Sequence, residues 1–575
     1  TRAVAFAAFA FAMPVLAGHP ETAAHLTLTA VAFAAVTWSA SNFESRFAYR
    51  FLAAGLLAGG LASIQMFPTI EWLQQLPKAF DLSWPPQPLH HILAWVSRDA
   101  TASHNSAGIW IPEGAAYIGM ITLIAAPVGL LHRSKRHVWF LGGLTLLSLA
   151  IAYGIDPIYS VAAHVPILAG LKNSRMLLLA GFGIAALAGL GISTLEDELP
   201  SIPRHRFAAL ALILISFAVA FLLVYELRLA TVTRVELLRR PSFSRALLLV
   251  GVIPLLLRLY GKLSRSAFTT AVCAILAFDL LTFSYGYMGF ANRDEIFPRA
   301  GVFGFLEKNA DPAQSRVVQI DGPFPPNANM VYGAASADGY EVRLAALHRA
   351  FSFDYMENRM DGFFYTAGRL LRFNDRRLDL MNVRYLVLPA TSPEFNRLLS
   401  TARFKLAYNN GYVAAFENKT VLPRAFLVAA TGVKVLAEVD DQLAVLRADD
   451  FDPQRTFTVS DLPQVLKQQP APQPESGAPL TRNVDTLSSG INGMTLRCTS
   501  PERSVLILSQ TYYPGWVAEI DGQRTEVFRA DITLTGISVP AGVHIVRVAF
   551  RPPSFTLGTI LTIVSTLFVV VLVRR

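Results

Sequence analysis

Long apolar runs, separated by short polar connections, fill the first half of the chain. A membrane-spanning helix needs about 20 mostly apolar residues, and ten runs approach that length. They lie at about 3–17, 22–38, 48–67, 115–131, 138–155, 177–194, 207–224, 245–260, 267–289 and 555–573. This pattern predicts a multi-spanning helical membrane domain over residues 1–290, with about nine helices, and a C-terminal transmembrane helix over 555–575. The run at 245–260 is the weakest, because Arg245 and Arg258 flank a short apolar centre and would have to extend to the interface.

Between these helices, residues 291–554 have the mixed pattern of an ordinary extramembrane region. Segments Ser315–Ile320 and Val383–Pro389 alternate like strands, and 342–350 and 435–447 show the apolar spacing of helices. We therefore expect a mixed α/β region over 291–462. Residues 463–482 are rich in Pro and Gln and predict a linker or loop.

Six short β-type runs then predict a β-sandwich region over 483–554 that leads directly into the last span. These runs are 493–498, 503–509, 515–520, 524–528, 533–538 and 543–550. Asp521-Gly522 lies between two of them and is a strong hairpin signal.

Composition and charge favour the same class of protein. Of the 575 residues 53% are hydrophobic and 16% are charged, whereas soluble proteins carry about a quarter charged residues. The net charge of +9 does not indicate a nucleic-acid partner, because many of the basic residues of the first half cluster between the apolar runs. The chain has no Walker loop, no GxGxxG after a strand and no CxxC pair, so ATP-driven transport and zinc chemistry find no support.

Basic residues in short connections predict the orientation of the helices, since such loops stay in the cytoplasm. The basic groups are Arg46 and Arg50, the segment 132–137, Arg204 and Arg206, Lys262 and Arg265, and Arg574 and Arg575. All five fit one orientation in the bacterial cytoplasmic (inner) membrane. That orientation makes loops 18–21, 68–114, 156–176 and 225–244 and region 291–554 extracytoplasmic. The basic loop 225–244 is the one exception to the rule.

The chain begins with Thr and enters an apolar helix at once, without a signal peptide. We therefore expect that its true N-terminus lies upstream of residue 1.

The first outer loop carries His19 and Glu21, with His25 one turn into the next helix. Ionisable groups at a membrane boundary are costly unless paired or hydrated. One interpretation is a carboxylate and an imidazole at the mouth of an outward-facing cavity, as a base, a metal ligand or a substrate contact. The other is a tight turn at Gly18 and Pro20, with Glu21 capping the following helix.

Loop 68–114 is long for a connection between spans and holds four tryptophans, which suit a membrane interface. One interpretation is a cover over a site for a lipid-linked substrate, with His90, His91 and Arg98 available to a phosphate. The alternative is interfacial packing with solvated charges.

Three further polar positions each allow two interpretations. Lys172 and Arg175 precede an outer helix start at about 177, where they could bind phosphate or act as interfacial anchors. Asp279 falls near the middle of a span, either as a functional acid or as a hydrogen bond between helices. The aromatic run 512–516 could stack on sugars or form a buried core around the hairpin.

Several separated pieces of the chain resemble the YfhO family of bacterial membrane proteins. They are Leu16-Ala17-Gly18-His19-Pro20-Glu21, Glu113 with Tyr117-Ile118-Gly119, the segment 166–175, Met381-Asn382-Val383-Arg384-Tyr385, Leu422-Pro423-Arg424-Ala425, and Tyr513-Pro514-Gly515-Trp516 with Asp521-Gly522 and the segment 540–544. They follow one another in order over nearly the whole chain.

The resemblance implies a GT-C-type glycosyltransferase architecture. Such an enzyme would move a sugar from a polyprenyl-phosphate donor to a cell-envelope glycan or polymer, such as lipoteichoic acid, on the outer face. The resemblance also implies a key acid on a first outer loop, which here would lie upstream of residue 1. Glu21 would then be a second acidic group of the site.

The candidate residues can be assigned on that basis. We expect Glu21, His19 and Glu113 near the reaction centre, and His90, His91, Arg98, Lys172 and Arg175 at the donor phosphate. Whether a divalent metal takes part stays open. The alternatives are a lipid-linked glycan transporter and a non-catalytic envelope assembly factor.

Overall fold

The computed structural model describes most of the chain, and it divides into two compact units. The described residues are 2–75, 85–95, 116–169, 171–198, 243–287, 291–297, 301–324, 327–338, 347, 351, 356–359, 366–370, 374–467 and 481–574. One unit comprises Thr1–Ala62, Asp81–Phe290 and Ser565–Arg575, and the other comprises Ser63–Phe80 and Ala291–Val564. The predicted span 207–224 and, apart from residue 347, the predicted helix 342–350 lie outside the described residues.

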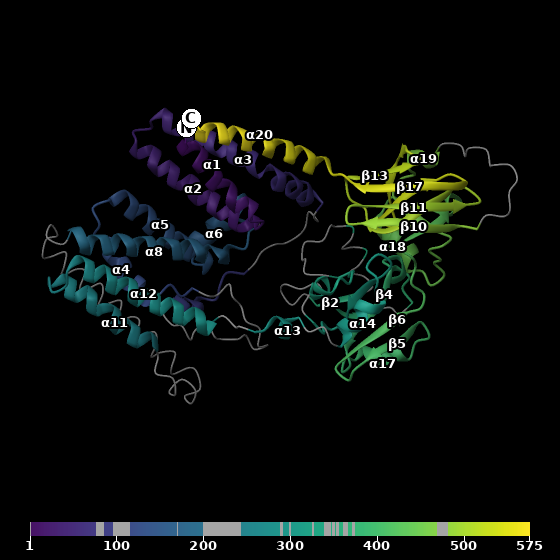
Figure 1. The fold of residues 1–575 in the computed structure, drawn as a ribbon, viewed down its shortest axis with the longest axis horizontal. Coiled ribbons are helices and arrows are strands. Elements are labelled where there is room, and N and C mark those ends of the chain that lie inside the picture. The colour runs from purple at the N-terminus through teal and green to yellow at the C-terminus, as the bar shows by residue number, and fades with distance from the viewer. Residues whose placement is uncertain are drawn as a thin grey trace. The chain divides into compact units, whose positions relative to one another are not determined.

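The first unit is helical throughout its described part (Figure 1). Its elements, with those that run on into the second unit, are α1 (Arg2–Leu16), α2 (Pro20–Ala40), α3 (Ser45–Gln74), η1 (Leu89–Trp95), α4 (Met120–Gly129), α5 (Lys135–Ala152), α6 (Ile158–Ala163), α7 (Pro166–Ala169), η4 (Asn173–Met176), α8 (Leu177–Ser193), η5 (Thr194–Glu198), α11 (Phe243–Leu259), α12 (Arg265–Tyr287) and α20 (Pro553–Arg574).

Five segments of the described chain are long and apolar enough to cross a membrane. They are Pro20–Ala40, Ser45–Gln74, Asn173–Asp197, Arg265–Tyr285 and Pro553–Arg574. Three shorter apolar helices are Arg2–Leu16, Met120–Gly129 and Val250–Leu259. Since many large apolar side chains on these helices are exposed, lipid is the medium that suits them, and the chain is a membrane protein.

The helices pack closely where small residues face one another. A Cβ added to Gly129 of α4 would lie against the Leu187 carbonyl oxygen of α8, and one added to Gly191 of α8 would lie against the Ala125 carbonyl oxygen of α4. Two glycines thus let the backbones approach, as at many helix contacts in membranes. Elsewhere in this unit the two ends of the chain meet, where Arg2 Nε donates to the Val573 carbonyl oxygen at 3.1 Å.

Arg258, near the end of α11, bonds to backbone carbonyl groups of neighbouring segments. Its guanidinium donates to the carbonyl oxygens of Leu195 at 3.0 Å, Glu196 at 2.8 Å and Leu263 at 3.1 Å. The guanidinium therefore supplies donors to two carbonyl groups of η5, the segment that follows α8. Helix ends leave such carbonyl groups without backbone partners. These contacts of Arg258 leave the expected extension to the membrane interface a prediction.

The second unit begins with a four-stranded sheet in the order β1-β4-β6-β5. Its strands are β1 (Arg316–Gln319), β4 (Val383–Pro389), β5 (Phe404–Asn409) and β6 (Val413–Asn418), with β1 parallel to β4 and the other pairs antiparallel. The helices and short strands around it are α13 (Arg293–Ile296), α14 (Val302–Asn309), η7 (Ala328–Tyr332), β2 (Met356–Arg359), β3 (Thr366–Leu370), α16 (Arg377–Leu380), α17 (Glu394–Leu399), η8 (Ala430–Gly432), β8 (Val433–Val435), α18 (Val439–Arg447), β9 (Phe457–Val459) and α19 (Gln464–Lys467).

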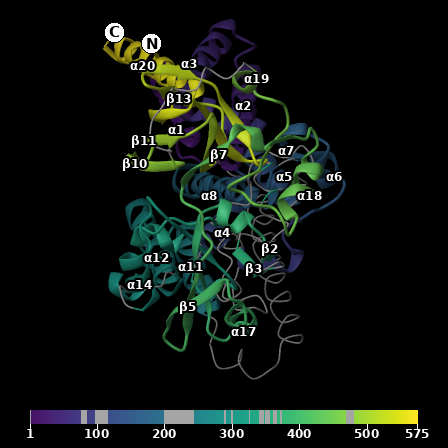
Figure 2. The same ribbon diagram turned by 90° about the vertical axis from the view of Figure 1, so that its right-hand side faces the viewer.

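A β-sandwich follows, with sheet orders β10-β11-β17-β13-β14 and β15-β16-β12-β7 (Figure 2). Its strands are β7 (Ala425–Ala429), β10 (Asn483–Gly490), β11 (Gly493–Ser500), β12 (Ser504–Thr511), β13 (Trp516–Ile520), β14 (Gln523–Thr525), β15 (Val527–Ala530), β16 (Leu534–Val539) and β17 (Gly542–Phe550). Side chains from both sheets share one core that includes Leu427, Leu506, Ile537, Val546 and Val548.

The predicted hairpin turn is present between β13 and β14. Ile520 pairs with Gln523 across the turn, and Asp521 and Gly522 have φ values of 51° and 86°. Two successive positive φ values match the type I′ geometry that suits the twist of a hairpin. β7 joins the sandwich from the region before the Pro/Gln-rich segment, by pairing with β12.

Candidate functional site

The turn between α1 and α2 brings two candidate residues to a helix start. Gly18 has a φ of 78°, which turns the chain, and Pro20 follows as the first residue of α2. His19 occupies the N-cap position, with Nδ1 3.2 Å from Thr22 N and 2.9 Å from Thr22 Oγ1. His19, not Glu21, therefore supplies the cap, which leaves the Glu21 carboxylate for another contact.

Arg175 contacts both predicted residues of this turn. Its Nη1 forms an ion pair with Glu21 Oε2 and lies 2.9 Å from His19 Nε2. Only 6% of the Glu21 side chain and 24% of the Arg175 side chain are exposed. The structure thus brings His19, Glu21 and Arg175 together, although about 150 residues separate them in sequence.

The short helix η4 holds Arg175 in place through Asn173. The Asn173 amide donates to the Leu168 carbonyl oxygen at 2.8 Å, and its Oδ1 lies 3.2 Å from His25 Nε2. Lys172, just before η4, is also buried, at 8% exposed. The predicted pair of cations therefore lies on the segment that faces the first turn of α2.

His25 adds a polar atom that the contacts among the described residues do not satisfy. Because Asn173 Nδ2 already donates to a carbonyl, Asn173 Oδ1 must accept the hydrogen bond from His25 Nε2. In a neutral ring the other nitrogen, Nδ1, is then an acceptor. His25 is 3% exposed, and its Nδ1, like Ser174 Oγ, has no hydrogen-bond partner within the described residues.

Sequence reasoning singled out His25 only as a neighbour of Glu21, and it missed Asn173 and Ser174. The i, i+4 spacing of Glu21 and His25, which places both on one face of α2, was a usable signal. No local pattern linked Asn173 to His25, because that contact joins helices far apart in sequence.

The cluster combines the groups needed for proton transfer and for binding an anion. A carboxylate or an imidazole acceptor takes a proton from an attacking hydroxyl. A guanidinium stabilises a phosphate through charge-assisted hydrogen bonds. Among the described residues of the cluster, Lys172 and Arg175 carry two positive charges and Glu21 carries one negative charge, a balance that favours an anionic ligand.

Part of the predicted loop cover packs beside this cluster. Trp95 of η1 is buried with Met176 and Leu177 in one core, and its Nε1 donates to Tyr153 Oη at 3.0 Å. His91 Nδ1 lies 3.0 Å from Gln87 Oε1. Arg98, Glu113 and the side chain of His90 lie outside the described residues.

Asp279 bonds to the start of another helix. The residue is 1% exposed; its Oδ1 accepts from Tyr117 Oη at 2.7 Å and its Oδ2 accepts from the Met120 backbone N–H at 2.8 Å. A carboxylate that accepts a backbone N–H at the first turn of α4 acts as a cap between helices. This geometry favours the structural interpretation of Asp279.

A bound metal ion would need several acidic, histidine or cysteine side chains close together. Within the described part of the chain no group of three or more such residues lies close enough together to hold an ion. Glu113 lies outside that part, so whether a divalent metal takes part stays open.

Comparison with known proteins places the β-sandwich in a family. Residues 481–562 match the family described as "Bacterial membrane protein YfhO". A curated relative, the "Uncharacterized protein YfhO" of Bacillus subtilis (strain 168), is 26% identical over 95 residues, which cover 16% of this chain and 11% of that protein. No solved structure matches the chain. Over the β-sandwich strands from β10 onward and the start of α20, the chain is therefore similar to the YfhO family of bacterial membrane proteins.

Proposed function

We propose that the chain is a membrane glycosyltransferase. It would transfer a sugar from a polyprenyl-phosphate-linked donor to a cell-envelope glycan or polymer on the extracytoplasmic face. The observation that carries this proposal is the contact of Arg175 with Glu21 and His19 at a helix start, with Lys172 and His25 beside it. Together these residues supply a proton acceptor and a phosphate-binding pair in one place.

The reaction needs both groups. The acceptor hydroxyl oxygen forms a bond to the anomeric carbon, and the bond between that carbon and the phosphate oxygen breaks. The polyprenyl phosphate leaves with the electron pair, and the hydroxyl proton passes to Glu21. Arg175 and Lys172 stabilise the departing phosphate, whose negative charge grows as the bond breaks.

The ion pair suggests how the site becomes active when the donor binds. In the structure the Glu21 carboxylate forms an ion pair with Arg175, so this contact competes with an attacking hydroxyl for the carboxylate. A donor phosphate competes with Glu21 for the same guanidinium, because both are anionic partners of arginine. Binding of the donor would then release the carboxylate next to the attacking hydroxyl.

His25 offers a second proton acceptor or a hydroxyl contact. Its Nδ1 is an acceptor without a partner within the described residues, one helical turn from Glu21. Leaving a buried acceptor unsatisfied costs about 1–3 kcal/mol, so a substrate hydroxyl that donates to it would bind more tightly. We assign Glu21 as the first proton acceptor and His25 as a contact to substrate.

The location of the site suits a lipid-linked donor. The cluster lies at the first turn of α2, a helix long and apolar enough to span the membrane. A site at that depth lets the polyprenyl chain stay in the bilayer while its phosphate and sugar reach the cluster.

The test is a transfer assay with the full-length protein. We would measure sugar release from a panel of polyprenyl-phosphate sugars by the parent and by Glu21→Gln. We expect turnover with at least one donor and a loss of about a hundredfold or more in the variant, as for removal of a general base. Glu44→Gln changes an exposed carboxylate just before α3 and is the matched control, which should keep parental activity.

Two outcomes would oppose the proposal. Turnover that survives in a folded Glu21→Gln protein would remove Glu21 from the reaction centre. Absence of turnover with every donor would favour a transporter or a non-catalytic assembly factor.

A further inference from the structure

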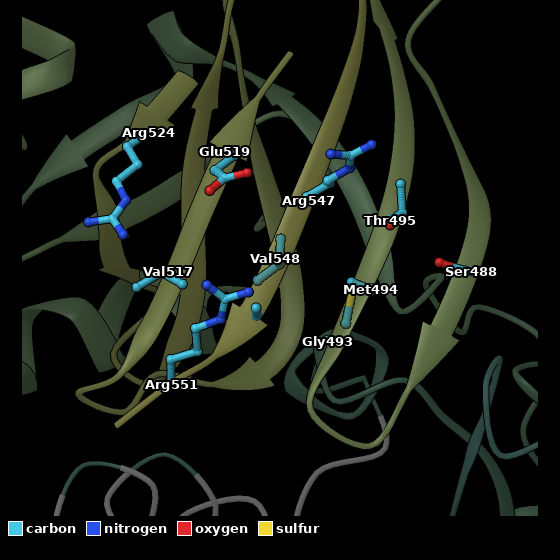
Figure 3. Close-up of a pocket in the computed structure, with 11 residues that line it drawn as sticks. Ser488, Gly493, Met494, Thr495, Val517, Glu519, Arg524, Arg547, Val548 and Arg551 are labelled. Carbon is cyan, nitrogen blue, oxygen red and sulfur yellow. The ribbon is translucent and has the colours of Figure 1, made fainter. Parts of the chain in front are cut away.

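A groove of about 360 Å³ lies on the five-stranded sheet of the β-sandwich, outside the site described above. Its polar lining consists of Ser488, Thr495, Glu519, Arg524, Arg547 and Arg551. Figure 3 shows these side chains on one face of the sheet, with Glu519 between Arg524 and Arg547. All of them fall within the segment 481–562 that matches the YfhO family.

The strand register places five of these residues in one row. Ser488 of β10 pairs with Thr495 of β11, Thr495 with Arg547 of β17, and Arg547 with Glu519 of β13, which pairs in turn with Arg524 of β14. Residues directly opposite on neighbouring strands lie on the same face, with Cβ atoms about 5 Å apart. The row is therefore a continuous polar strip across all five strands.

The adjoining row has small side chains, which makes the hollow. Gly493, Ala549 and Val517 are paired neighbours on β11, β17 and β13. A Cβ on Gly493 would lie 2.5 Å from the Val548 carbonyl oxygen, so no larger residue fits there without a shift of the strands. Arg551 extends over this floor towards Val517 and Val548 (Figure 3).

The charges of the groove favour an anion. It contains three arginines and one glutamate, and all three arginines are exposed. Within the described residues none of the three guanidinium groups has an ion-pair or side-chain hydrogen-bond partner in the protein. Planar guanidinium groups with free N–H donors bind phosphate oxygens in pairs, so a phosphate group is the ligand that the lining fits.

The groove also lies close along the chain to a transmembrane helix. Arg551 is two residues before Pro553, the first residue of α20, and its backbone N–H donates to the Gly515 carbonyl oxygen at 2.7 Å. The rings of Tyr513 and Trp516 pack against Phe550, with centroids 6.0 Å and 5.1 Å apart. Aromatic residues at the end of a span are typical of the membrane interface.

We propose that this groove binds the phosphate of an anionic membrane lipid. The free arginine donors supply the recognition of phosphate, and the junction with α20 places the groove at headgroup level. Arg547 of β17 and Arg551, which lies between β17 and α20, contact the phosphate. Glu519, which the register places between Arg524 and Arg547, lowers the affinity for anions through its negative charge. Binding would fix the β-sandwich against the bilayer surface beside its anchor.

The test uses the full-length protein in an uncharged detergent and short-chain lipids as probes. Calorimetric titration would compare dihexanoyl phosphatidylglycerol, dihexanoyl phosphatidylcholine and free glycerol phosphate. We expect phosphatidylglycerol to bind most tightly. The double variant R547Q/R551Q should bind it about thirtyfold more weakly, at about fivefold for each basic residue lost.

Two further variants make the result specific to the groove. Arg497→Gln removes an exposed arginine of β11 that does not line the groove and should leave the affinity within about twofold, since surface charges interact weakly through water. Glu519→Gln removes the one negative charge and should bind phosphatidylglycerol more tightly than the parent.

Three results would overturn the proposal. One is equal affinity of the parent and R547Q/R551Q for phosphatidylglycerol. Another is equal binding of phosphatidylcholine and phosphatidylglycerol by the parent. The third is free glycerol phosphate binding as tightly as the lipid, which would assign the groove to a water-soluble anion. None of these measurements depends on sugar transfer.

Discussion

At the scale of single residues, the contact of Arg175 with Glu21 can be part of a reaction centre or a purely structural ion pair. Arg175 and Glu21 are both largely buried, and removing one partner of such a pair is destabilising, by about 3–5 kcal/mol when burial is complete. Their contact therefore stabilises the structure whether or not it takes part in chemistry. The two roles separate only when stability and activity are measured on the same variants.

Asp279 offers a prediction with two matched substitutions. Asp279→Ala leaves the Tyr117 hydroxyl and the Met120 N–H without their acceptor, which should cost about 1–3 kcal/mol. Asp279→Asn keeps one carbonyl oxygen and should cost less. In detergent, the thermal unfolding midpoint should fall in the order parent, Asp279→Asn, Asp279→Ala. Loss of sugar transfer in a well-folded Asn variant would contradict the structural role of Asp279.

Asp531 predicts how the stability of the second unit depends on pH. The residue is 1% exposed and accepts from the Thr458 N–H at 2.9 Å, and burial raises the pKa of its carboxyl from 3.8 to about 7. The folded state thus holds a proton that the unfolded state releases. Stability from this group is fully present below pH 3.8 and is lost as pH rises to about 7.

The measurement compares the parent with Asp531→Asn, which keeps an acceptor for Thr458 and cannot ionise. A rise of the pKa from 3.8 to about 7 corresponds to on the order of 4 kcal/mol in the free energy of unfolding. The thermal midpoint of the parent should therefore fall relative to that of the variant between about pH 4 and pH 7. A difference between the two midpoints that stays constant over this range would contradict the prediction.

The sequence showed much of the candidate site at this scale, and a physical reason explains what it did not show. His19, Glu21, Lys172 and Arg175 were singled out as ionisable groups beside apolar helices, where they are costly without partners. That argument applies to each residue alone. It could not show that Arg175 bonds to Glu21, or that Asn173 fixes the ring of His25, because both contacts join segments about 150 residues apart.

Among the elements, the contact of α4 with α8 depends on small residues. A side chain on Gly191 would meet the Ala125 carbonyl oxygen, whereas Gly189 on the same helix has open space around it. Gly191→Ala should therefore destabilise the protein by about 1–3 kcal/mol through overpacking. Gly189→Ala should stabilise it by up to about 1 kcal/mol, since alanine is the better helix former.

Thermal unfolding of both variants in detergent is the measurement. The pair is matched because each adds one methyl group to α8 at positions two residues apart. Equal effects of the two substitutions would show that the backbone approach at Gly191 does not stabilise the contact.

Elements were predictable where a local signal marks them. Val383–Pro389 matches β4 in both bounds, and Asp521-Gly522 marks the turn between β13 and β14, because both signals come from neighbouring residues. β10 escaped notice because its burial pattern is almost wholly exposed, so it lacks apolar alternation. The pairing of β7 with β12 depends on a contact between segments about 80 residues apart.

For the whole molecule, the orientation in the membrane is the main property still predicted from the sequence alone. The basic residues at 132–137 predict that this connection faces the cytoplasm. The same basic pattern predicts that the β-sandwich lies on the opposite side of the membrane, together with the α1–α2 turn.

Cysteine labelling tests the orientation. In a protein with Cys273→Ser and Cys498→Ser, a single cysteine would replace either the exposed Arg133 or the exposed Ser488. A membrane-impermeant maleimide applied to spheroplasts should label position 488, and should label position 133 only after the membrane is opened. Labelling of position 133 in intact spheroplasts would reverse the proposed orientation.

The central claim is that the cluster of Glu21 and Arg175 is a reaction centre, and a double-mutant cycle tests it most directly. The rate of sugar transfer and the thermal midpoint would be measured for the full-length parent, Glu21→Gln, Arg175→Gln and the double variant. Each single variant removes one charge of the ion pair and keeps the other, whereas the double variant removes both charges. We predict that the double variant recovers much of the lost stability and remains at least about a hundredfold less active than the parent. A double variant that regains sugar transfer together with stability would contradict the account, since the ion pair would then be structural alone.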